Sequence, residues 1–143
     1  MSGRSLSFER SRVILSTLWI FAILNYLYAD VMGSMDAKVL ETILSGTVGS
    51  IEMTPGFFLM GAILMETAIV MVLLTRILAW RANRIANIVA GVIHTLAVSA
   101  SMFVEGPPAP YYIFFGTVEI ACTLFIIWFA ITWKRPTEGS TVL

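Results

Sequence analysis

The sequence predicts an all-α membrane protein, a four-transmembrane-helix up-down bundle with a short outer interfacial helix. The 143 residues are 58% hydrophobic and 13% charged, whereas about a quarter of the residues in a typical soluble domain are charged. The mean hydropathy is +0.87. Four apolar runs are each about 20 residues long, and at about 1.5 Å per residue each run spans the roughly 30 Å hydrocarbon core of a bilayer.

One transmembrane domain, residues 13–133, accounts for most of the chain. The predicted spans are residues 13–31, 55–76, 85–104 and 111–133. A basic arm at 1–12 precedes the domain and a short tail at 134–143 follows it. The first run is longer than the apolar part of a signal peptide and lacks a convincing cleavage site, so we interpret it as a retained helix.

Basic residues gather on one side of the predicted bundle. Eight of the nine lie before the first span, between the second and third, or after the fourth: Arg4, Arg10, Arg12, Arg76, Arg81, Arg84, Lys134 and Arg135. Only Lys38 lies in another connection. Because cytoplasmic loops carry an excess of Lys and Arg, we expect cytoplasmic N- and C-termini.

The first span carries polar residues in its outer half. Asn25 can hydrogen-bond to a neighbouring helix or contact a ligand, and the sequence leaves both readings open. Tyr26 and Asp30 are four residues apart and can share a hydrogen bond.

The connection at residues 32–53 is predicted to contain a short amphipathic helix. Asp36 can cap a helix at about 37–44, whose apolar residues form one stripe. Such a helix lies at the membrane surface, over the outer mouth of the bundle. The acidic residues of this rim, Glu52 among them, either concentrate cations or only reflect the topology rule.

Between Pro55 and Thr75 the second span contains one charge, Glu66, near its midpoint. A carboxylate at that depth costs roughly 2.5–3.5 kcal/mol on insertion scales and needs a partner, a proton or a cavity. Pro55 after Thr54 is typical of a helix start.

The third and fourth spans contain further polar and ionisable residues that are candidates for a site. A stripe of small and polar residues on the third span faces protein rather than lipid: Asn87, Gly91, His94, Ala97 and Ser101. His94 is the only histidine. On the fourth span Glu119 and Cys122 are one turn apart, and the single cysteine excludes an internal disulfide.

Helical rise places three ionisable groups at one depth. Glu66, His94 and Glu119 lie about 16, 15 and 12 Å below the outer boundary, with Asn25 somewhat above them. Two carboxylates in one apolar site cannot both stay ionised, so one should hold a proton beside the imidazole. The same three side chains could instead hold a single divalent metal, or form an ion-pair network that only fixes helix packing.

We therefore expect a protein that binds a proton plus a small cationic or amphipathic ligand, in transport or sensing. Glu66 and Glu119 are the expected acceptors, His94 the relay and Asn25 the orienting donor. Secondary candidates are Tyr26, Asp30, Glu52 and Cys122. The expected partners are the lipid bilayer and a small-molecule or cation ligand, and transport would require a homodimer.

Two alternatives remain open at this point. One is a non-catalytic membrane scaffold or subunit, and the other is a metal- or quinone-linked membrane redox enzyme. A site without a cofactor is favoured over a single metal, and a binding protein over an enzyme. No residues support nucleic-acid binding, a phosphate loop or a nucleophilic triad.

Three segments, 18–30, 45–55 and 88–95, resemble a family of short bacterial four-helix membrane proteins of unknown function. The resemblance covers about residues 13–133, implies four spans in a bacterial inner membrane, and supplies no activity. The architecture is also similar to that of DoxX-type four-helix proteins, without a diagnostic motif. The small multidrug exporters share the size and a membrane glutamate, but theirs lies in the first helix, where this chain has Asn25.

Overall fold

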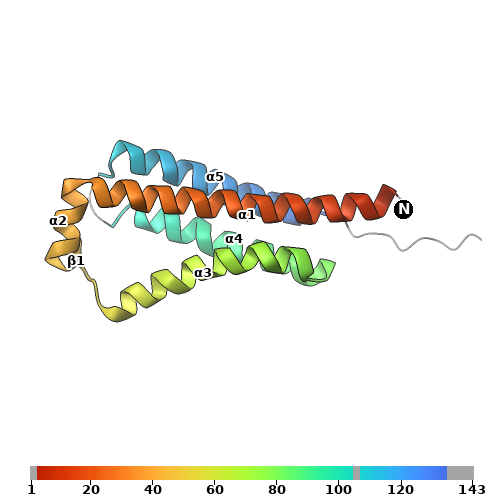
Figure 1. Ribbon diagram of the computed structural model, residues 1–143, viewed down its shortest axis with the longest axis horizontal. Coiled ribbons are helices and arrows are strands. Elements are labelled where there is room, and N and C mark those ends of the chain that lie inside the picture. The colour runs from red at the N-terminus through yellow and green to blue at the C-terminus, as the bar shows by residue number, and fades with distance from the viewer. Residues whose placement is uncertain (1–2, 105–106, 135–143) are drawn as a thin grey trace, which may run out of the picture.

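The computed structural model describes residues 3–104 and 107–134. Within them the fold is the predicted all-α bundle (Figure 1). Its long helices are α1 (Gly3–Met35), α3 (Pro55–Ile77), α4 (Trp80–Ser101) and α5 (Pro110–Thr132). Four spans, the first of them Phe8–Met35 within α1, are long and apolar enough to cross a membrane. The chain is therefore a multi-pass membrane protein by length and composition.

Two helices differ in extent from the predicted spans. Helix α1 begins at Gly3, so residues expected to form a separate arm continue the helix. Helix α4 begins at Trp80 rather than at residue 85. Hydropathy locates the apolar part of a helix, but the backbone continues through polar residues when none of them breaks it. The tail predicted at 134–143 lies outside the described residues except for Lys134.

A short helix and a hairpin join α1 to α3. Helix α2 (Ala37–Ser45) has Asp36 as its N-cap, whose side chain accepts from the Lys38 N–H at 3.0 Å. It ends at Gly46, whose φ of 75° is left-handed and suits glycine. Strands β1 (Thr47–Val48) and β2 (Ile51–Glu52) then pair antiparallel. The cap agrees with the sequence, whereas the hairpin was not predicted.

The two ends of the bundle differ. We call the end that carries α2 and the hairpin the α2 end. The opposite end, where α1 begins and α3 passes into α4, is the arginine end. Figure 1 shows α3 leaning away from the other helices towards the α2 end. Accordingly, residues 55–63 of α3 are all exposed, and its buried residues, Ala68, Met71 and Thr75, lie in its second half.

The tightest packing lies in the middle of the bundle and towards the arginine end. Leu15, Trp19 and Ile126 are each 0% exposed. Helices α4 and α5 meet closely at Gly91, where an added Cβ would lie 2.7 Å from Cγ1 of Ile127. The cavity described below lies on the other side of this closed core, towards the α2 end.

Candidate functional site

A cavity of about 160 Å³ lies between α1, α3, α4 and α5. This is the volume of about five water molecules at roughly 30 Å³ each. Its lining is Tyr26, Ala29, Asp30, Leu64, Met65, His94, Ala97, Val98, Ser101, Tyr112 and Glu119. The lining contains two carboxylates, an imidazole and two phenols, but no Lys or Arg.

His94 is held in place by aromatic side chains of α1. The imidazole is 1% exposed, and its Nδ1 lies 3.1 Å from the Tyr26 hydroxyl. The Tyr26 ring stacks on it at 5.5 Å between centroids, and Trp19 meets it edge-on at 5.4 Å. The other ring nitrogen, Nε2, is buried without a hydrogen-bond partner. One ring nitrogen of His94 is therefore hydrogen-bonded, and the other is buried without a partner.

Glu119 brings a second unpartnered group to the cavity. Its side chain is 5% exposed, and Oε1 is buried without a hydrogen-bond partner. Buried polar atoms in native proteins are nearly always hydrogen-bonded, so two such atoms on residues of one cavity lining are unusual. A bound ligand, proton or water that bridges to them would satisfy both.

Asp30 is exposed, one turn along α1 from Tyr26, and also lines the cavity. It lies close enough to Glu119 for the two charges to interact. Nearby, the Tyr112 hydroxyl donates to Oγ of Ser101 at 2.8 Å, which links α5 to α4. The cavity thus has one exposed and one buried carboxylate, and its lining contains no Lys or Arg to pair with either of them.

The structure brings together only some of the residues predicted for the site. His94 and Glu119 line one cavity, together with the secondary candidates Tyr26 and Asp30. The expectation that Glu66 lies buried beside them is wrong, because Glu66 is exposed and outside the lining. The inward residue Thr75 is nine positions along the helix, which at about 100° per residue places it on the opposite side of α3 from Glu66.

Three other predicted residues also lie away from the cavity lining. Asn25 donates to the Phe21 carbonyl oxygen of its own helix at 2.8 Å, so it orients nothing in the cavity. Glu52 is exposed in β2. Cys122 is buried, with Sγ 3.5 Å from the Leu18 carbonyl oxygen.

The metal alternative required Glu66, His94 and Glu119 in one coordination sphere. Among residues 3–104 and 107–134, no group of three His, Cys, Asp or Glu side chains is placed to hold a metal ion. The exposed position of Glu66 is the reason that this particular triad does not form.

Sequence reasoning missed a buried polar ladder, which we define as Trp19, Asn87, Asn83 and Thr75. Trp19 Nε1 donates to Asn87 Oδ1 at 2.8 Å, and Asn87 Nδ2 donates to Asn83 Oδ1 at 2.7 Å. Asn83 Nδ2 in turn donates to the Thr75 carbonyl oxygen at 2.7 Å. The four-residue spacing of Asn83, Asn87 and Gly91 was the available signal, because it extends the predicted stripe on α4.

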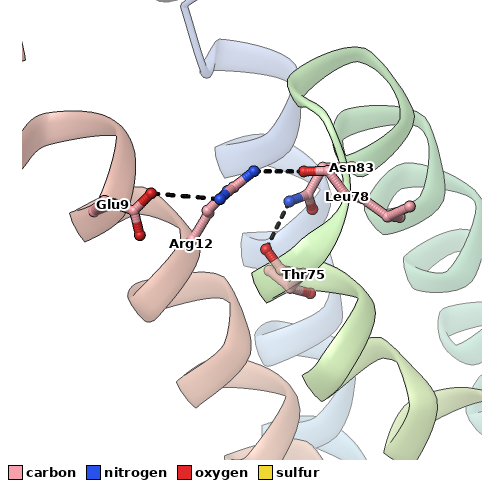
Figure 2. Close-up of polar contacts among 5 residues, drawn as sticks. All are labelled: Glu9, Arg12, Thr75, Leu78 and Asn83. Atoms are coloured by element: carbon pink, nitrogen blue, oxygen red, sulfur yellow. Dashed lines mark hydrogen bonds and ion pairs between the residues drawn. The ribbon is translucent and has the colours of Figure 1, made fainter. Parts of the chain in front are cut away.

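The ladder ends beside an arginine that joins two helices (Figure 2). Arg12 donates from Nη2 to the Leu78 carbonyl oxygen at 2.7 Å, at the C-terminal end of α3. Its Nη1 forms an ion pair with Glu9 at 3.4 Å. Figure 2 shows Asn83 and Thr75 next to this contact. Arg12 therefore caps the C-terminal end of α3. The sequence indicated only that Arg12 is one of the basic residues that orient the chain in the membrane.

Comparisons with known proteins identify a family and no activity. A family of unknown function, DUF6326, matches residues 6–140. No curated protein and no solved structure matches the chain, and the similarity to DoxX-type proteins is not shown. Because the family match covers nearly the whole sequence, the chain belongs to the DUF6326 family of unknown function.

Proposed function

We propose that this membrane protein binds a small organic cation in exchange for a proton in the cavity between α1, α3, α4 and α5. The observation that carries the proposal is the pair of buried, unpartnered atoms, Oε1 of Glu119 and Nε2 of His94, in one cavity lining. The two carboxylates of the site are therefore Glu119 and Asp30, rather than Glu119 and Glu66 as the sequence predicted.

The charge and shape of the lining favour a cation. Two carboxylates in a lining without Lys or Arg attract positive charge, and the attraction is stronger in a site of low dielectric constant. The phenol rings of Tyr26 and Tyr112 line the same space, and aromatic faces stabilise organic cations such as quaternary ammonium groups. The volume of about 160 Å³ limits the ligand to a small one.

The proton is assigned to Glu119 and the imidazole. A buried carboxyl group without a partner is satisfied either by a proton or by a cation. Entry of the cation therefore displaces the proton, and His94 Nε2 is the nearby acceptor in this scheme. Nε2 can accept this proton when Nδ1 carries the ring hydrogen and donates it to the Tyr26 hydroxyl oxygen 3.1 Å away, and the imidazolium then releases the proton to the solvent.

The closed half of the bundle favours sensing over transport within one chain. Between the cavity and the arginine end the core contains Trp19, Asn87 and Asn83, all 0% exposed and hydrogen-bonded to one another. Passage through this layer would require the ladder to break. A binding or sensing role requires no such change.

Choline in lipid nanodiscs tests the proposal, with 3,3-dimethyl-1-butanol as its neutral isostere. We expect choline to bind at least tenfold more tightly than the isostere, with release of a proton measurable in buffers of different ionisation enthalpy. Glu119→Gln should weaken choline binding at least tenfold and abolish the proton release. Glu52→Gln, an exposed change outside the cavity, is the matched control and should leave both unchanged.

Equal binding of choline and the isostere would exclude a cation site, and no binding of either would exclude the proposal for this ligand class. In the second case the rival function, a non-catalytic scaffold, would be preferred. The polar ladder supports that rival, because its hydrogen bonds join α1, α3 and α4. A scaffold predicts that Glu119→Gln changes stability without changing any ligand response.

The orientation of the chain in a bacterial inner membrane is part of the proposal. Arg12, Arg76, Arg81 and Arg84 all belong to the arginine end of the described structure. By the positive-inside rule, we expect this end to lie in the cytoplasm. The cavity, which lies towards the opposite end, would then face the outer side of the membrane.

A further inference from the structure

The outward side of α3 carries a stripe of exposed residues that the cavity does not use. We define the α3 stripe as Leu59, Ala62, Glu66, Ile69 and Leu73, all of them exposed. Helices α1 and α4 pack against α3, whose buried residues are Ala68, Met71 and Thr75. Leu64 and Met65 contribute to the cavity. The stripe is thus a separate surface.

Glu66 makes this surface unusual. It is the twelfth of the 23 residues of α3, at the centre of the span. A carboxyl at this depth is at its most costly in contact with lipid, and ionisable residues inside membranes almost always face protein or water. Lipid tails offer it no hydrogen-bond partner. The position therefore calls for a protein partner that presents a polar group at the same depth.

The spacing of the stripe fits a second helix. Its members follow one another by three, four, three and four residues, which is the a/d pattern of helices that wind around each other. Glu66 occupies one such position between apolar neighbours. Ala62, one turn away, is small enough to permit close approach of two backbones.

Charge asymmetry restricts how two copies can meet. Because the basic residues are concentrated at the arginine end, every copy inserts in the same orientation. Two copies are then related by an axis along the membrane normal, and a two-fold contact places equivalent residues opposite one another. Glu66 of one copy would face Glu66 of the other at one depth. A protonated carboxyl donates and an ionised one accepts, so the two side chains satisfy each other.

We propose that two copies of this chain pair in parallel through the α3 stripe, with the two Glu66 side chains hydrogen-bonded through a shared proton. The interface is independent of the cavity and of the cation proposed to bind there. It supplies a partner for Glu66, which has none among the described residues of a single chain.

Disulfide cross-linking of the full chain in native membranes tests the geometry of the pair. Ile69→Cys lies on the stripe, and oxidation should link two copies. Met60→Cys is the matched control, because Met60 is 71% exposed but lies about 120° around the helix from Glu66. The parent chain, whose Cys122 is buried, should remain monomeric on a denaturing gel. Cross-linking of Met60→Cys as efficient as that of Ile69→Cys would overturn the proposal.

The role of Glu66 is tested by the dissociation of labelled copies on dilution in liposomes, followed by energy transfer. Glu66→Gln keeps a donor and an acceptor and should dimerise within threefold of the parent. Glu66→Ala should dimerise about 3- to 30-fold more weakly, the range of one interhelical hydrogen bond in a membrane. Glu52→Ala should match the parent.

Dimers of Glu66→Ala as tight as the parent's would overturn the pairing of the carboxyls. A parent that stays monomeric at every dilution would overturn the interface itself, leaving lipid or a different protein to cover the stripe. Retention of the helical circular-dichroism signal in each variant shows that a loss of dimer is not a loss of fold.

Discussion

At the scale of single residues, the polar side chains inside the bundle fall into two groups. Those of the ladder are hydrogen-bonded to one another across helices, as with Trp19 and Asn87. In the cavity, by contrast, Oε1 of Glu119 and Nε2 of His94 have no partner. The ladder atoms have the hydrogen-bond partners that a structural role requires. The two cavity atoms have no partner and are therefore free to bind a ligand, as a binding role requires.

Replacing Asn87 should weaken the fold. Asn87→Leu would leave Trp19 Nε1 and Asn83 Oδ1 buried without partners, and one such group costs about 1–3 kcal/mol. We expect a loss of unfolding free energy of this order, measured by denaturation in mixed micelles. Asn25→Leu is the matched control. Its amide bonds only to the Phe21 carbonyl oxygen of its own helix, so stability should change by less than about 0.5 kcal/mol.

Removing the Tyr26 hydroxyl tests how His94 is held. Tyr26→Phe keeps the stacked ring and deletes the contact to Nδ1. The loss should cost about 0.5–1.5 kcal/mol and should change the balance of the imidazole tautomers, which ¹⁵N chemical shifts report directly. Tyr28→Phe, an exposed change on the same helix, should alter neither. An unchanged His94 spectrum in Tyr26→Phe would show that the hydroxyl does not select the tautomer.

The sequence allowed the depth of a side chain to be predicted better than its direction. Helical rise placed His94 and Glu119 at similar depths, and both line the cavity. The same arithmetic included Glu66, which faces outwards. Helix α4 has a polar stripe that shows which side is inward. Besides Glu66, the polar residues of α3 are Thr67 and, near its end, Thr75 and Arg76, which form no continuous stripe that would indicate the rotation of the helix about its axis.

At the scale of the elements, α3 differs from its neighbours. Only its second half is packed, and the first half leans away at the α2 end. The capping pattern of Thr54 followed by Pro55 predicted where α3 begins, and the structure has Thr54 as the N-cap and Pro55 as the first helical residue. Hydropathy could not predict the lean, which depends on how α1 and α4 share the surface of α3. The hairpin of β1 and β2 was also missed, since strands of two residues each leave no alternating pattern.

The contact between α4 and α5 depends on a glycine. Gly91→Ala would place a Cβ 2.7 Å from Cγ1 of Ile127 and 3.4 Å from the Thr123 carbonyl oxygen. The Ile127 side chain must move, so we expect a loss of about 1–3 kcal/mol from overpacking, measured by thermal unfolding. Gly61→Ala on α3 is the matched control, because its Cβ would meet nothing within 4 Å. Equal stability of the two variants would show that α4 and α5 separate at little cost.

At the scale of the whole molecule, the bundle has two unlike halves. Towards the arginine end the helices are tied by the ladder and by the contact of Arg12 with Leu78. Towards the α2 end, α3 diverges and the cavity lies between the helices. The proposed binding role uses this division, because the cavity lies in one half and the other half is closely packed. Composition could predict the spans but not this division, because it arises from contacts between helices distant in sequence.

The proposed orientation of the chain predicts which of its two ends is accessible from outside the cell. If the arginine end is cytoplasmic, a cysteine at Ser50 in the hairpin connection should react with a membrane-impermeant maleimide on intact cells. A cysteine at Arg81, at the start of α4, should react only after the membrane is opened. Both positions are exposed, so access rather than burial decides the result, and the buried Cys122 gives a low background. The reverse labelling pattern would place the cavity mouth in the cytoplasm. The proposed ligand would then have to be a cytoplasmic cation.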